Sequence, residues 1–214
     1  MELGELLDRS DEFQDLLIRT STDALFEESE RYRLSRSACD LAMQHALSFK
    51  LLLADELFAS AIPLVRLQYD LVVRAFWIFY VATDNQIGKL GADLSNSAIK
   101  RADRLPGLSE MMKQLESDAP KNAQPVVAHL LEFKEYSWKP LSSFVHGGIH
   151  AINRHRNGYS IEIVSDLVKN SNALNHLAAR LAAVLAGDKT LLAMLNACWR
   201  DYIDCLPIDK RLMV

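Results

Sequence analysis

Apolar residues recur every three to four positions along most of the chain, the spacing that places them on one face of an α-helix. No segment gives a convincing strand pattern, and 8 Gly and 6 Pro among 214 residues leave few turns for a β fold. We predict an all-α protein, an up-and-down bundle of six to seven substantial helices. The predicted helical segments are residues 1–20, 23–57, 59–83, 84–103, 109–116, 125–137, 141–154, 160–186 and 189–206.

Neither a repeat of fixed period nor a low-complexity linker divides the chain. We therefore expect a single helical domain over residues 1–214, with residues 1–20 and 208–214 at its periphery. The long segment 23–57 changes from charged to apolar along its length, which predicts a bend or break near Ser35–Ser37. Pro63 is predicted in the first turn of the next helix, where its missing amide proton costs nothing.

The predicted helix that contains Pro63 is apolar nearly all round, which is typical of a buried central helix. It nevertheless carries Arg66, Asp70 and Arg74, whose spacing of four residues puts them in one stripe. Charges on such a helix are seldom buried unless they are paired. Two interpretations stay open: an internal ladder in which Asp70 bonds both arginines, or an arginine that faces a cavity and binds an anion.

A second polar stripe has the same spacing on the predicted helix 141–154. It consists of His146, His150 and Arg154, and Lys139 and Ser143 extend it upstream. Histidine is the side chain that exchanges protons near neutral pH, and cations beside it suit the handling of a phosphodiester. We therefore predict that any chemical site lies within residues 139–156.

Two glycines adjoin this second stripe. Gly147 and Gly148 would each cost a helix about 1 kcal/mol relative to Ala, so we expect them where a backbone or a ligand approaches closely. The predicted catalytic residues are His146 and Lys139, and the predicted substrate-binding residues are His150, Arg154, Arg66, Asp70 and Arg74.

Charge and composition narrow the functional classes. The formal net charge of −4 argues against a surface that is basic throughout, although a local basic patch is compatible with it. The acidic N-terminus has no signal-peptide pattern, and no stretch approaches about 18 uninterrupted apolar residues. We expect a cytoplasmic protein with no membrane contact.

The three cysteines lack metal-site spacing and are expected as small buried side chains in a reducing compartment: Cys39, Cys198 and Cys205.

Motifs for metals and cofactors are nearly absent. His146 and His150 match half of a metal site, and Asp70 and His45 are candidate further ligands, but HExxH and ExxH do not occur. The motifs GxGxxG, GxxxxGK[ST] and GxSxG are missing as well. We expect no cofactor, and a mononuclear metal site stays a minor alternative.

Two segments carry a resemblance to a known family: the run from Leu64 to Trp77, with its Arg-and-acid stripe, and the run from Tyr136 to Gly148, with its Ser-Ser-Phe-Val-His-Gly-Gly sequence. Together they resemble uncharacterised bacterial helical proteins that are distantly similar to the HEPN superfamily, which includes abortive-infection proteins. The resemblance covers residues 40–155. It implies a helical bundle that dimerises, and in many members a metal-independent ribonuclease whose Arg-x₄₋₆-His motifs meet across the dimer.

The chain departs from this motif. No Arg precedes any of its six His at that spacing, and Lys139, with six residues between it and His146, lacks the bidentate fork of Arg. The first hypothesis is an RNA-binding or RNA-cleaving protein in bacterial defence or a toxin–antitoxin system. The alternative is a non-enzymatic homodimeric module that regulates a protein partner, and the second alternative is a metal-binding helical bundle.

Overall fold

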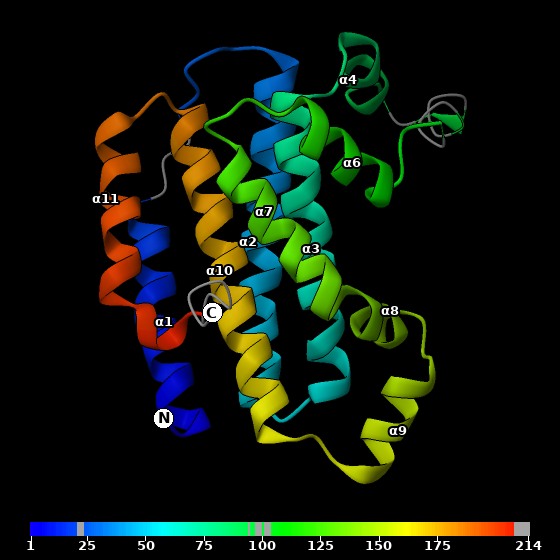
Figure 1. The fold of residues 1–214 in the computed structure, drawn as a ribbon, viewed down its shortest axis with the longest axis vertical. Helices are drawn as coiled ribbons and strands as arrows, with labels where there is room; N and C mark the ends of the chain where they lie inside the picture. Colours follow the sequence, from blue (N-terminus) through cyan, green and yellow to red (C-terminus); the bar gives the residue numbers. More distant parts are fainter. Residues whose placement is uncertain (21–23, 94, 97–99, 101–103, 208–214) are drawn as a thin grey trace.

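Four long helices form the body of the molecule: α1 (Leu3–Arg19), α2 (Glu30–Ala54), α3 (Phe58–Tyr80) and α10 (Ile161–Leu185). In the computed structural model, which describes residues 1–20, 24–93, 95, 96, 100 and 104–207, they run along the longest axis (Figure 1). α2 packs antiparallel to α3, and α10 packs against α1, α2 and α3. These described ranges contain no strand, and the predicted all-α bundle is confirmed.

Shorter helices are added to this body. A π-helical turn at Lys134–Trp138 joins the helix that ends at Phe133 to the helix that begins at Lys139. A 3-10 turn at Ile203–Cys205 follows the helix that ends at Asp201. More helices are present in the described ranges than the six to seven predicted, because short helices end at turns that hydrophobic spacing does not reveal. They are α4 (Asp84–Leu90), α6 (Leu108–Asp118), α7 (Gln124–Phe133), α8 (Lys139–Val145), α9 (Ile149–Asn157) and α11 (Lys189–Asp201).

The core is centred on α3, as its nearly continuous apolar sequence predicts. Trp77 and Tyr69 are fully buried, and each uses its one polar atom to bind a neighbouring helix. The Trp77 indole N–H donates to Gln114 Oε1 on α6 at 2.7 Å, and the Tyr69 hydroxyl donates to the Leu130 carbonyl on α7 at 2.9 Å. A buried aromatic residue with its polar atom satisfied contributes area without the cost of an unpaired group. These contacts hold α6 and α7 against the body.

The boundaries of α2 differ from the prediction. Residues 24–29 are not helical, and α2 begins at Glu30. The first position of the predicted helix 23–57, residue 23, lies outside the described residues. The predicted break near Ser35–Ser37 is wrong, because α2 continues through it. The buried Ser35 hydroxyl donates to the Ala75 carbonyl of α3 at 3.0 Å, so this polar residue joins two helices.

The prediction that Pro63 lies in a first turn is also wrong. α3 begins at Phe58, and Pro63 stands inside the helix, one turn further on. Its nitrogen therefore cannot donate to the Ala59 carbonyl, a loss that the extensive packing of α3 against α2 offsets.

The N-terminal helix α1 is part of the body. α1 buries Leu6, Phe13 and Leu17 in the core, whereas residues 208–214 lie outside the described residues. The predicted burial of the three cysteines is confirmed, and each is a free thiol: Cys39, Cys198 and Cys205. Among the helices described, none is both long and apolar enough to cross a membrane.

Candidate functional site

The predicted helix over residues 141–154 is in fact two helices. α8 ends at Val145, and Gly147 adopts the left-handed conformation (φ +62°) that reverses the chain before α9 begins. His146 is thus the C-cap of α8, while His150 lies in the first turn of α9. Their spacing of four residues does not place the two imidazoles on one helical face, so the prediction of a continuous stripe is wrong.

Ser143 holds the junction between α8 and α9. Its carbonyl accepts the Gly148 amide at 2.6 Å, and its hydroxyl accepts the His150 amide at 3.1 Å. A Cβ on Gly148 would lie 2.6 Å from the Ser143 hydroxyl oxygen and 3.2 Å from its carbonyl oxygen. The close approach predicted at these glycines therefore involves the backbone and side chain of Ser143.

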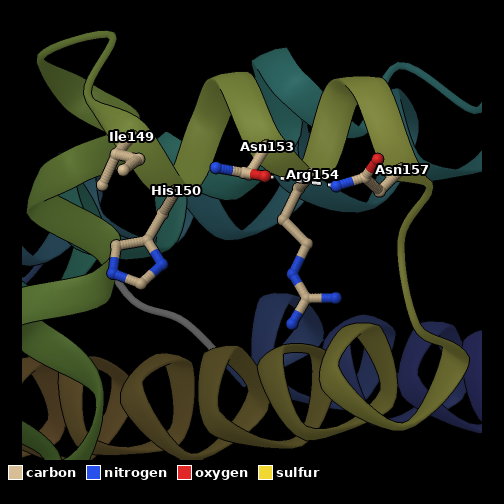
Figure 2. Close-up of a pocket in the computed structure, with 5 residues that line it drawn as sticks. All are labelled: Ile149, His150, Asn153, Arg154 and Asn157. Atoms are coloured by element: carbon tan, nitrogen blue, oxygen red, sulfur yellow. Dashed lines mark hydrogen bonds between the residues drawn. The ribbon is translucent and has the colours of Figure 1, made fainter.

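α9 presents a polar face toward α10 and has no buried residue of its own. Figure 2 shows the His150 and Arg154 side chains leaving α9 on the same side, with the guanidinium directed toward α10. A cavity of about 350 Å³ follows this face, and Asn157 Nδ2 donates to Asn153 Oδ1 at 3.2 Å along it. Its lining residues are Ile149, His150, Asn153, Arg154 and Asn157.

A larger cavity, of about 470 Å³, adjoins the first and shares His150 and Arg154 with it. We call it the α9–α10 pocket, after the two helices that face each other across it. Its floor is apolar and buried, and aromatic side chains lie along its sides. The floor consists of Ile62, Leu141, Val164 and Leu167, and the aromatic residues are Tyr136, Phe144 and Tyr159.

Two polar side chains of the pocket are available to a ligand. Among the described residues, the side chains of His150 and Arg154 have no hydrogen-bond or ion-pair partner. The Tyr159 hydroxyl is buried and likewise has no partner there, and burial raises the pKa of this phenol. Its ring stacks on Phe58, with centroids 5.0 Å apart. A buried polar atom without a partner is uncommon in folded proteins.

The opposite wall belongs to α10 and carries Asp166 and Asn170. Both line the pocket, and the Asn170 amide donates to the Asp166 carbonyl at 2.8 Å. Sequence reasoning missed these two residues and Tyr159. Their spacing of four residues was a weak signal, because it places Asp166 and Asn170 on one face of a helix but does not say that a cavity adjoins that face.

The charged stripe of α3 lies outside both cavities. Arg66 is buried, forms an ion pair with Asp70, and donates from Nε to the Ser142 hydroxyl at 3.2 Å. Its guanidinium carbon lies 4.6 Å from the centroid of the Trp138 ring, and burial lowers its pKa to about 10. Arg66 therefore joins α3 to α8. The half-buried Arg74 has no such pair with Asp70 in the part of the chain described, so only half of the predicted ladder is present.

The two predicted catalytic residues are exposed and lie outside both cavities. Lys139 begins α8 and His146 follows its end, so their backbones are separated by about 10 Å along the helix axis. No group of three or more His, Cys, Asp or Glu side chains gathers as a metal site within the described ranges. His146, His150 and Asp70 are thus not brought together, and the metal-binding alternative gains no support.

The model of one protein family matches residues 39–208, which include every helix that lines the pocket. This family, DUF6988, is described as a family of unknown function. No curated protein and no solved structure is significantly similar to the chain. The resemblance to HEPN and abortive-infection proteins gains no support from these comparisons and stays a prediction. Since the match covers most of its length, the chain belongs to the DUF6988 family.

Proposed function

We propose that this protein binds single-stranded RNA and that the α9–α10 pocket receives one of its nucleotides. The observation that carries the proposal is the pairing of two features in one cavity. His150 and Arg154 point into it without an acidic partner among the described residues, and its floor and sides are apolar and aromatic. Cationic groups bind phosphate, and aromatic rings stack on bases.

The charge on the α9 side of the pocket supports an anionic ligand. No Asp or Glu occurs between Tyr136 and Ile161, while Lys139, Arg154 and Arg156 do, in a chain whose net charge is −4. The remainder of the protein is therefore more acidic than the total indicates. Like charges repel, so a polyanion is directed to this end of the molecule and away from the rest.

The size and lining of the pocket favour a single unpaired nucleotide. A volume of about 470 Å³ falls within the range of roughly 300–1,000 Å³ that is usual for small-molecule sites. A base can lie on the apolar floor and stack against the half-buried Phe144 or Tyr159. Bases of a duplex are paired and stacked and cannot enter, so the pocket selects single strands.

The test is fluorescence anisotropy with a short labelled RNA, in the presence of EDTA. We expect the single strand to bind more tightly than the matching duplex, and affinity to fall roughly tenfold between about 50 mM and about 200 mM salt, as two or three phosphate contacts predict. No binding of the single strand at low salt would contradict the proposal. Cleavage in EDTA that His146→Ala abolishes would add the ribonuclease activity predicted from the sequence.

A second candidate function, self-association as a homodimeric module, rests on exposed apolar side chains at the end of α8 and on α9. Val145, Ile149 and Ile152 are 37%, 71% and 66% exposed, although α9 has only nine residues. Isolated helices of this length are marginal in water, so a second copy packed on these side chains would stabilise α9.

Light scattering across a range of concentrations tests this candidate. A wild-type dimer that Ile152→Glu converts to a monomer is the expected result, because a charge in an apolar interface is costly. Ile203→Glu is the matched control, since Ile203 is 65% exposed but lies beyond α11. A strictly monomeric wild type removes this candidate.

A further inference from the structure

The α9–α10 pocket has two walls of opposite character. The α9 wall contributes His150 and Arg154, and the α10 wall contributes the carboxylate of Asp166. Arg154 and Asp166 line one cavity, but among the described residues they do not form an ion pair with each other. A ligand that was only an anion would be repelled by Asp166. The lining therefore fits a ligand that presents an anionic group to α9 and a hydrogen-bond donor to α10.

The α10 wall offers a carboxylate and a side-chain amide. The Asp166 carboxylate is exposed at the rim, and an ionised carboxylate only accepts hydrogen bonds. The Asn170 side-chain amide donates one N–H to the Asp166 carbonyl at 2.8 Å, which leaves its second N–H and its Oδ1, so the Asp166 carboxylate is the group of this wall that can only accept. Since a carbonyl can only accept, this contact also fixes which Asn170 atom is the nitrogen.

We infer that Asp166 makes the pocket selective for bases that carry an amino group. The inference rests on the proposed RNA binding and specifies which nucleotide the pocket takes. With the phosphate at His150 and Arg154, the base lies on the apolar floor with its hydrogen-bonding edge toward Asp166 and Asn170. Cytosine then donates its N4 amino group to the carboxylate. Uracil has the O4 acceptor at that position, and two acceptors repel each other.

Cytosine and uracil give the sharpest comparison, because oligo(C) and oligo(U) of equal length have the same backbone charge. We expect the wild-type protein to bind oligo(C) about tenfold more tightly at near-neutral pH, the effect of one charge-assisted hydrogen bond set against one repulsive contact. Asp166→Asn supplies an amide that can donate to O4 of uracil. This variant should reduce the ratio of the two dissociation constants to about one or reverse it.

Asp118→Asn is the matched control, since it removes the same charge from an exposed position on α6 and should keep the wild-type ratio. Asp166 is exposed, so its replacement should leave the thermal unfolding curve unchanged. Equal binding of oligo(C) and oligo(U) by the wild type overturns the inference but leaves RNA binding intact. An unchanged ratio in Asp166→Asn overturns the role of Asp166. Failure of every single strand to bind overturns the proposed function and this inference with it.

Discussion

Replacement of Arg154 by Glu should weaken the binding of single-stranded RNA by at least about 100-fold, since it removes a charged contact and places a like charge beside the phosphate. Arg154 is half-buried, and its guanidinium points from α9 across the pocket (Figure 2). Arg156, two residues along the same helix, is exposed and does not line either cavity. Arg156→Glu changes the net charge equally but should weaken binding only about threefold, because water and salt screen an exposed charge.

Anisotropy titrations of the two variants at one salt concentration separate local contact from general attraction. Equal losses in Arg154→Glu and Arg156→Glu would mean that the pocket contributes nothing beyond its charge. Arg154→Lys refines the comparison, because Lys keeps the charge but lacks the planar fork that binds phosphate through two hydrogen bonds. We expect this variant to lie between the wild type and Arg154→Glu.

The long helices follow from the sequence, whereas the junction that shapes the site does not. α3 and α10 each maintain a helical pattern of burial for more than twenty residues, which is ample for a prediction from spacing. The residues from 141 to 154 show an equally good helical spacing, yet the chain turns at Gly147. That turn depends on the hydrogen bonds from the amides of Gly148 and His150 to Ser143, which exist only once the chain has folded back.

The same limit applies to the site. His150 and Arg154 were predicted as ligand-binding residues from their spacing of four residues, and both line the pocket because that spacing is kept within α9. The groups that complete the pocket come from elsewhere in the chain. Asp166 is recognisable as part of a site only when α9 is known to face α10. Arg66 is the opposite case. Its charge on an apolar helix suggested a cavity, but its side chain instead joins α3 to α8.

Acid should destabilise the protein through His176, which lies far from the pocket on the buried face of α10. This histidine is 2% exposed and packs between Phe13 and Trp199, with ring centroids 5.9 and 5.1 Å away. Its Nε2 lies 2.7 Å from the Leu195 carbonyl oxygen, and its Nδ1 is buried without a partner in the described part of the chain. Burial, with a smaller contribution from the Arg180 charge, lowers the pKa of His176 from 6.5 to about 4.

The direction of the effect follows from this lowered pKa. Between pH 6.5 and about 4 the unfolded chain binds a proton at this histidine and the folded protein does not. The free energy of unfolding therefore falls as the pH decreases through that window, by about 3 kcal/mol from this one group. The contribution is fully present above pH 6.5 and is lost near pH 4, where the buried imidazole also becomes protonated.

Urea unfolding of the wild type and of His176→Gln across this pH window isolates the contribution of His176 from that of the carboxylates. The glutamine variant should be less stable near pH 7, because it packs poorly between two aromatic rings, but it should lose about 3 kcal/mol less than the wild type on acidification. His155→Gln, at an exposed position on α9, should retain the wild-type slope. If the free energy of unfolding changed with pH equally in the wild type and in His176→Gln, His176 would bind its proton equally in the folded and the unfolded protein. The buried ring between Phe13 and Trp199 would then be open to water in the native ensemble.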